Sequence, residues 1–377
     1  MKLYLSLFFL ILLSCKPSEN QEISIADKVL DPGNPPQWTF YPAQGVSQNK
    51  HIVLISGDEE YRSEEALPQL AKILSTHHGY DCTVLFAQDP EYPGIIDPNY
   101  SFNIPGLEQL EIADLMVIFT RFRDLPSDQM KHFDNYLLKG KPVLGIRTAT
   151  HAFNFKDKSH SYIHYGWKYN GDNTDWKLGF GKIILGESWY THHGWHKHQS
   201  TRGILAEGAS NHPITNGIAE GALWGSTDVY GIREPIGDNA QHIYLGQSVD
   251  REGDYNEENL LYGMSESDTA VAHSSKPDSD PAYNPNEVMP PIVWTKNYKL
   301  ENGAPGQSVT TTIGAAVDML DEDVRRLLVN ATLYLLEEKV PSKAKVDLVG
   351  DFKPTAFQFH KDEYWDEKQL KVPASVF

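Results

Sequence analysis

Residues 51–57 read HIVLISG, and this continuous apolar run decides the fold class. A strand that is apolar along its whole length is buried on both faces, as the strands of parallel sheets are. Residues 63–79 follow with SEEALPQLAKILSTHHG, which predicts an amphipathic helix with Ser63 as its N-cap and Gly79 as its stop. A buried strand followed by such a helix predicts an α/β protein.

The same alternation continues toward the C-terminus. Further strands are predicted at 82–88, 114–121 and 142–148, with a second amphipathic helix at 127–140. Buried strands that alternate with amphipathic helices predict a doubly wound parallel sheet with helices on both faces.

The second half of the chain is less regular. Strands are predicted at 180–185, 243–249, 290–298 and 308–314. The clearest helix of the chain follows, and Asp321 can cap it. Residues 250–289 form a long polar insertion, which we expect to be a functional flap or a surface excursion.

The N-terminus, MKLYLSLFFLILLSC, combines a basic start with an apolar run that is too short to span a bilayer. We interpret residues 1–14 as a lipoprotein signal peptide and Cys15 as the lipidated residue, the alternative being an ordinary signal peptide with an incidental cysteine. The protein would then be exported and anchored to the membrane of the bacterial cell envelope, on the periplasmic or outer-membrane side. We expect a flexible tether at 15–47, an α/β domain at 48–341 and a C-terminal extension at 342–377 that packs on the domain.

Acidic side chains outnumber basic ones by 51 to 33, which gives a formal net charge of −18. A chain with this balance lacks the basic surface that nucleic acids require, so nucleic acid is excluded as a partner. The second cysteine, Cys82, lies in a predicted strand, where we expect a small buried side chain without a disulfide.

Polar side chains follow three predicted strands, at the sheet edge where doubly wound proteins bind ligands. They are Asp58, Glu59 and Arg62, then Arg121 and Arg123, then Arg147, Thr148 and His151. Carboxylates and guanidinium groups together suit a neutral polyhydroxylated ligand, although each residue alone could also be solvated or cap a helix. The chain has no GxxxxGKS/T phosphate loop and no GxGxxG after its first strand.

The sequence PVLGIRTATHAF (142–153) places a sharp turn directly after a predicted strand. Enzymes with a nucleophile elbow carry serine or cysteine at such a turn. Here the turn carries Arg147, Thr148 and Ala149, which argues against covalent acyl or glutamine chemistry.

Residues 192–199 read HHGWHKHQ and hold four of the fifteen histidines. In an extended run, His192, His196 and His198 would face one side and His193 the other. Three imidazoles could bind a divalent metal such as zinc, with Glu187 as a further ligand or a base. The same side chains could transfer protons or bind substrate, or the segment could be a polar loop without chemistry.

Several motifs, in order, carry a resemblance to a known family. They are GIRTATHAFNF, FGKIILGESWYTHHGWHKHQSTRGI, HPITNGI, LWGSTDVYGI, MPPIVWTKNY, TTTIGAAVDMLDEDVRRLLVNATLYLLE and VDLVGDFKPTAF. Across roughly residues 48–360 the chain resembles the ThuA-like (trehalose utilisation) family of the class I glutamine-amidotransferase-like superfamily. The resemblance implies a flavodoxin-like sheet with long loop insertions, loss of the amidotransferase cysteine, and a role in carbohydrate metabolism. It also implies sugar oxidoreductases or isomerases as pathway partners.

The motifs of this resemblance single out site residues. They are Arg147, Thr148, His151, His192, His193, His196, His198, Arg202, Asp228, Tyr230, Trp294 and Lys296. Asp318 could cap the last helix or reach the cleft, and Trp294 could stack on a sugar or simply belong to a core strand.

The first functional hypothesis is an enzyme that acts on keto-sugars or keto-glycosides by general acid–base chemistry. His192 or His196 would carry the proton, Glu187 or Asp58 would orient it, and Arg147 would polarise an oxyanion, with a divalent metal as an optional cofactor. His151 is a further catalytic candidate. The residues expected to contact the carbohydrate are Glu59, Arg62, Thr148, His193, Arg202, Asp228, Tyr230, Trp294 and Lys296. The second hypothesis is a non-catalytic carbohydrate-binding accessory lipoprotein.

Overall fold

A computed structural model describes residues 24–237, 239–274, 276 and 283–373. The predicted signal peptide at 1–14 and the predicted lipidation site Cys15 lie outside these residues. None of the helices in the described ranges is long and apolar enough to cross a membrane.

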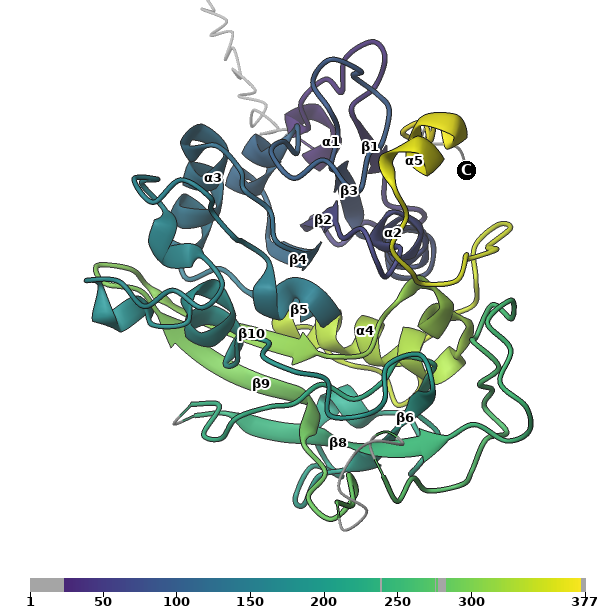
Figure 1. The fold of residues 1–377 in the computed structure, drawn as a ribbon. Coiled ribbons are helices and arrows are strands. Elements are labelled where there is room, and N and C mark those ends of the chain that lie inside the picture. Colours follow the sequence, from purple (N-terminus) through teal and green to yellow (C-terminus); the bar gives the residue numbers. More distant parts are fainter. Residues whose placement is uncertain (1–23, 238, 275, 277–282, 374–377) are drawn as a thin grey trace, which may run out of the picture.

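One ten-stranded sheet organises the molecule (Figure 1). Its parallel part contains five strands in the order β3-β2-β4-β5-β10. These strands are β2 (His51–Gly57), β3 (Asp81–Phe86), β4 (Leu115–Thr120), β5 (Val143–Ile146) and β10 (Pro305–Thr311). Every residue of β2, β3 and β4 is buried, as the continuous apolar runs predict.

The rest of the sheet is antiparallel. Beyond β10 lie β9 (Pro291–Lys299), β8 (Gln241–Asp250), β6 (Gln199–Leu205) and β7 (Trp224–Gly225), and β1 (Trp38–Tyr41) pairs antiparallel to β3 at the other edge. The mixed α/β class is therefore confirmed, but the sheet is not parallel throughout. The finer doubly wound, flavodoxin-like classification stays a prediction. Strand β1 lies within the range predicted as a tether, so the folded domain begins before residue 48.

Helices cover both faces of the parallel part. Helices α2 (Ser63–His78) and α4 (Glu322–Leu335) share one core with alternate residues of β2, whereas α3 (Ser127–Leu138) shares the other core with the remaining ones. The short helices α1 (Ile25–Lys28) and α5 (Asp362–Lys368) lie outside these layers. Because side chains alternate along a strand, the same apolar run supplies both cores.

The strand predicted at 180–185 is wrong, because residues Gly181–Leu185 form a single π-helical turn. A short apolar run can be a buried helical turn as well as a strand, and periodicity does not distinguish the two. This turn packs against the segment after β5, where a Cβ on Gly181 would lie 2.1 Å from the carbonyl oxygen of Thr150. Only glycine permits that approach.

Two peripheral segments meet beside the sheet. The C-terminal segment, yellow in Figure 1, runs from α4 past α2 to α5, and Lys371 forms a β-bridge with Ile95. The 250–289 insertion, described at 250–274, 276 and 283–289, contributes Tyr262, whose hydroxyl donates to the carbonyl of Phe357. The side chain of Phe357 is fully buried.

Candidate functional site

Strand β5 ends in the geometry of an elbow. Arg147, the first residue after β5, has φ +45°, the left-handed region that non-glycine residues rarely adopt. Its guanidinium is fully buried between the rings of Tyr61 (4.4 Å) and Tyr230 (4.0 Å) and donates to the carbonyls of Thr312 (2.5 Å) and Asp228 (3.0 Å). The elbow thus carries a buried cation, and Arg147 does not reach the exposed position that its predicted contact with an oxyanion requires.

The carboxylate of Asp228 lies next to the guanidinium of Arg147. Its Oδ1 accepts a hydrogen bond of 3.3 Å from Nη2 of Arg147. The segment before Asp228 is held by the buried carboxylate of Asp318, which accepts from the backbone and hydroxyl of Ser226 and from the hydroxyl of Thr227, at 2.9–3.0 Å. Asp318 therefore neither caps α4 nor enters the site. It positions the segment that presents Asp228.

Two histidines share the carboxylate of Asp228. His192 Nδ1 lies 2.8 Å from Oδ2 and His196 Nδ1 lies 2.9 Å from Oδ1, with the two imidazole centroids 4.5 Å apart. Burial alone would raise the pKa of Asp228, but the charge of His192 and the hydrogen bonds from both rings lower it well below its usual range. Asp228 is therefore ionised and accepts from both Nδ1 atoms.

His196 is bonded at both nitrogens. Its Nε2 lies 3.1 Å from Oε1 of Glu60, a buried residue of the turn after β2. Burial opposes the charged imidazole, but the hydrogen bonds to Asp228 and Glu60 outweigh it and raise the pKa of His196 to about 9. At neutral pH His196 is an imidazolium held between two carboxylates.

His192 presents its other nitrogen. Because Nδ1 donates to Asp228, the neutral ring carries its lone pair on Nε2, for which the described residues supply no hydrogen-bond donor. One third of the side chain is exposed (33%), and the rings of Trp189 (5.6 Å) and Tyr230 (5.5 Å) pack beside it. This arrangement resembles a general base with a carboxylate behind it.

A metal-ligand set is also present, with a different membership from the predicted one. Ligand atoms of His192, His196 and Asp228 all lie within 4.8 Å of one another, and two imidazoles with a carboxylate suit zinc. The predicted third ligand, His198, is not in this group, because its ring stacks between Trp195 (3.6 Å) and Tyr255 (4.3 Å). A bound ion would have to displace the protons that now join both Nδ1 atoms to Asp228.

Two further predicted residues anchor the insertion instead of facing this cluster. His193 Nε2 lies 2.6 Å from the carbonyl oxygen of Pro285. Arg202, on β6, donates to the carbonyls of Glu266 (3.0 Å) and Asp268 (2.8 Å). Most of their partners are backbone atoms of the 250–289 segment, and Arg202 also donates to the carbonyl of Gly221 (3.3 Å), so their role here is structural.

Three more predicted residues lie around the π-helical turn. Glu187 is fully buried and bonded to Arg233 at 2.7 Å, so it does not orient the histidines. Trp294 is fully buried and donates to the carbonyl of Leu185 at 2.6 Å, which makes it a core residue and not a surface for sugar stacking. Burial and neighbouring Lys182 lower the pKa of Lys296 to about 8, and its ammonium donates to the carbonyl of Ile183.

The acidic turn after β2 forms its own network. Asp58 accepts from the hydroxyl of Thr148 and from the backbone of Glu60 (2.7 Å), and burial and Glu59 raise its pKa to about 6. Glu59 pairs with Arg121 and, at 2.9 Å, with Arg123. These contacts fix the turn that presents Glu60, and none of them orients a histidine.

The remaining predicted residues have structural roles around the site. Arg62 donates to the carbonyl of Gln358 (2.9 Å) and faces the ring of Trp365, so it holds the C-terminal segment. His151 is buried between Phe122 (4.9 Å) and Trp189 (5.0 Å), and burial and Arg121 lower its pKa well below the usual range. A neutral, buried His151 contributes an aromatic surface.

Three residues that contact the cluster were not predicted from the sequence. Glu60 follows two acids that were selected, and nothing in GDEEYR indicates which carboxylate reaches a histidine. The ring of Tyr61 packs against both Arg147 and His196, and Phe357 stacks on Tyr61 at 5.4 Å. Apolar and aromatic residues at these positions carry no local signal of function.

No protein-family model matches the chain, and no curated protein is similar enough to count as a match. Two solved structures align with most of it. A protein of Bacteroides uniformis described as thua-like is 16% identical with a TM-score of 0.44, covering 78% of this chain and 95% of its own. A protein of Parabacteroides merdae with the same description is 14% identical with a TM-score of 0.40, covering 84% and 98%. Similarity at this level assigns no chemistry to this chain.

Proposed function

We propose that this protein is an enzyme of carbohydrate metabolism in which His192 moves a proton on a keto-sugar or keto-glycoside. The observation that carries the proposal is the Asp228–His192 hydrogen bond of 2.8 Å, which leaves Nε2 of a one-third exposed imidazole available as a base. An imidazole with one nitrogen bonded to a buried carboxylate and the other available to the substrate is the arrangement that general acid–base catalysis requires.

The proton comes from a carbon next to the substrate carbonyl. The C–H bond breaks, the proton moves to Nε2 of His192, and the electron pair forms an enolate on the former carbonyl oxygen. The His192 imidazolium then returns the proton to the former carbonyl carbon, while the hydroxyl proton of the neighbouring carbon moves to the former carbonyl oxygen, which isomerises the sugar. If it instead protonates a glycosidic oxygen on the next carbon as that C–O bond breaks, the aglycone leaves and a C=C bond remains.

His196 supplies fixed positive charge to this reaction. Its imidazolium lies 4.5 Å from the ring of His192 and keeps both N–H groups bonded to carboxylates, so it does not compete for the substrate proton. A permanent charge beside the proton carrier would stabilise an enolate that forms next to His192 without needing to reorganise.

The carbohydrate class rests on three supporting observations. The rings of Trp189 and Tyr230 flank His192, and aromatic faces suit the C–H faces of sugar rings. The sequence has no phosphate-binding loop and a net charge of −18, which disfavour polyphosphate ligands. The turn after β5 lacks a nucleophile, and the sequence motifs resemble the ThuA-like family.

The experiment follows loss of deuterium-exchangeable C–H signals from a 3-keto-glucoside in D₂O by NMR. The His192→Ala protein should exchange at least about 100-fold more slowly than the wild type, the usual contribution of a positioned acid–base group. His198→Ala is the matched control, since it removes an imidazole from the same loop but outside the cluster. Equal rates for the wild type and His192→Ala would remove His192 from the mechanism.

Two other outcomes separate the remaining hypotheses. Saccharide binding without exchange or product would support the non-catalytic accessory protein. Zinc or another divalent ion found by elemental analysis, together with loss of turnover on chelation, would make His192, His196 and Asp228 metal ligands.

We also propose that the protein is exported and held at the cell-envelope membrane by a lipid on Cys15. The lipobox-like ending of MKLYLSLFFLILLSC supports this. Labelling with a palmitate analogue should mark the wild type and not Cys15→Ser. Equal labelling of both proteins would refute the anchor.

A further inference from the structure

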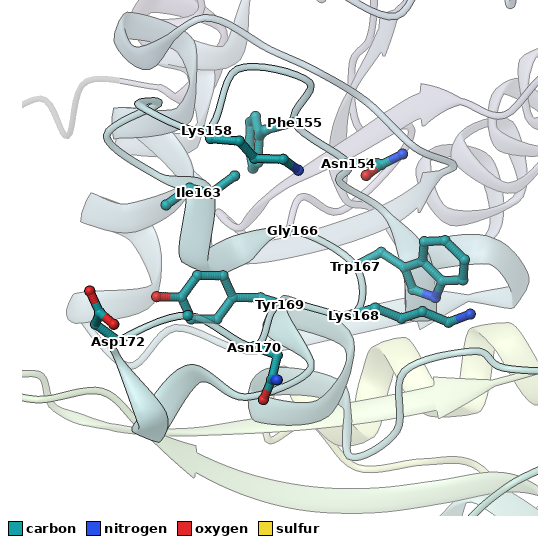
Figure 2. A pocket seen from close by; sticks show the side chains of 11 residues that line it. Asn154, Phe155, Lys158, Ile163, Gly166, Trp167, Lys168, Tyr169, Asn170 and Asp172 are labelled. Carbon is teal, nitrogen blue, oxygen red and sulfur yellow. The ribbon is translucent and has the colours of Figure 1, made fainter.

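A cavity of about 460 Å³ lies in the segment between β5 and the π-helical turn (Figure 2). Its lining contains three aromatic residues, Phe155, Trp167 and Tyr169, and polar side chains that include Asn154, Lys158 and Asp172. Figure 2 shows Phe155 and Lys158 on one side of it and Tyr169 on the opposite side. The volume falls in the range of small-molecule sites.

The loop that forms one wall is tightly closed. A Cβ on Gly179 would lie 2.1 Å from the carbonyl oxygen of Gly166, so the two ends of the loop touch. The backbone of Leu178 donates to the carbonyl of Tyr169 (2.7 Å), and the Tyr169 hydroxyl accepts from the backbone of Asn173 (3.1 Å). Tyr169 is therefore fixed at both its backbone and its hydroxyl, so it is positioned before any ligand arrives.

The three rings are not equally available. Phe155 stacks on His160 (4.2 Å, 14°), and Trp167 is covered by the ammonium of Lys168 (4.1 Å) and by Phe122 (4.9 Å). Within the described residues no aromatic ring stacks on Tyr169, which is only partly buried. Tyr169 thus offers the ring face that a ligand can cover.

The cavity is connected to the histidine cluster through two indoles. Trp167, in the cavity wall, donates from Nε1 to the carbonyl of Trp189 (2.7 Å), and the two indoles lie 6.0 Å apart. Trp189 in turn lies 5.6 Å from the ring of His192. Two ring contacts, of 6.0 and 5.6 Å, therefore separate the cavity wall from the proposed proton carrier.

We propose that this cavity is a second carbohydrate subsite, which binds a sugar unit of a substrate whose oxidised unit lies at His192. A pyranose has apolar C–H faces and a rim of hydroxyls, so it can stack on Tyr169 while its hydroxyls bond to Asn154, Lys158 and Asp172. The substrate class is then an extended glycoside instead of a single sugar. This refinement rests on the proposed function, but the binding of saccharide at the cavity does not.

The test compares Tyr169→Ala with Tyr92→Ala, which removes a 63% exposed aromatic ring outside the cavity. Binding of glucose disaccharides and trisaccharides is measured by saturation-transfer NMR, and kinetics with 3-keto-glucosides that carry either a methyl or a disaccharide aglycone. Tyr169→Ala should lose the oligosaccharide signal and raise KM about tenfold for the long substrate only, which corresponds to about 1.4 kcal/mol. Tyr92→Ala should match the wild type in both measurements.

A second variant guards against local misfolding. Lys158 is exposed on the opposite side of the cavity, and Lys158→Ala should weaken the same oligosaccharide signal with an unchanged unfolding curve. The subsite is refuted if the wild type binds no oligosaccharide, or if neither variant changes its binding. Turnover with equal KM effects on long and short substrates would refute the subsite and leave the proposed function standing. Oligosaccharide binding that depends on Tyr169, without any turnover, would support the subsite and refute the proposed function.

Discussion

The loop at 192–198 places its four histidines in two different environments. His192 and His196 bond to the buried carboxylate of Asp228, whereas His193 bonds to the backbone of the insertion and His198 stacks between Trp195 and Tyr255. The four imidazoles differ in their partners and not in their residue type. A carboxylate makes an imidazole a charged or basic group, while a carbonyl or an aromatic ring leaves it a structural one.

The backbone of the loop produces this division. His193 and Gly194 both donate to the carbonyl of Val229, at 2.8 and 3.1 Å, which turns the chain between the first two histidines. Lys197 adopts φ +64° and ends the expected alternation before His198. An extended run would have put His192, His196 and His198 on one face. The turn at Lys197 instead directs His198 away from the other two.

The largest expected effect comes from removing the shared carboxylate. Asp228→Ala leaves Arg147 buried without its carboxylate partner and should cost roughly 3–5 kcal/mol of unfolding free energy. Urea unfolding followed by circular dichroism measures the change. His193→Ala, on the other side of the loop, should cost no more than about 1.5 kcal/mol of unfolding free energy. Equal losses for Asp228→Ala and His193→Ala would contradict the distinction between the histidines bonded to Asp228 and the other two.

The pH dependence of stability should distinguish His196 from the other three. The folded pKa of His196 is about 9 against an ordinary 6.5, so its contribution is fully present below pH 6.5 and is lost as pH rises through 9. The wild type should lose on the order of 3 kcal/mol more than His196→Ala across this window. Parallel stability curves from pH 6 to 10 would contradict the imidazolium assignment.

A smaller effect is expected where β6 holds the insertion. Arg202→Ala removes charge-assisted hydrogen bonds to the carbonyls of Glu266 and Asp268 and should cost about 1.5–3 kcal/mol. Limited proteolysis should cut the variant faster within 250–289, while proton exchange on a keto-sugar stays within about twofold of the wild type. Loss of exchange at an intact insertion would make Arg202 part of the site.

The smallest effect concerns His198. Replacing it by alanine removes a stacked ring between Trp195 and Tyr255 and should cost about 0.5–1.5 kcal/mol. Thermal unfolding measures the loss, and catalysis should be unchanged. A His198→Ala protein with impaired exchange would return His198 to the cluster.

Sequence patterns predicted the regular core well, because burial leaves a periodic trace. The apolar runs at 51–57, 82–88 and 114–121 became β2, β3 and β4. Helix α2 was also predicted, but Ser63 is its first helical residue and not the predicted N-cap, since Arg62 takes that position. Strand β1 was missed because its four residues lie in a proline-rich stretch, and the run at 180–185 was assigned to the wrong element because it is too short to show a period.

The sequence indicated most residues of the site but not which of them contact one another. Asp228, His192 and His196 were all selected, but the pairing of Asp228 with both rings depends on the turn at Val229 and on Asp318, which lies far along the chain. Arg147 was assigned to substrate because it follows a strand, whereas its left-handed φ directs the guanidinium into the protein. Tertiary contacts of this kind leave no mark in local sequence.

Phe357 is synthesised later than every other residue of the cluster. The groups that bond to one another, from Glu60 to Asp228, leave the ribosome well before the aromatic ring that stacks on Tyr61 and lies 6.0 Å from His196. A nascent chain therefore carries its imidazoles without this aromatic cover until Phe357 has been synthesised. A polypeptide that ends before Phe357 would keep the proton-transfer groups but lack the ring that packs on Tyr61 and His196.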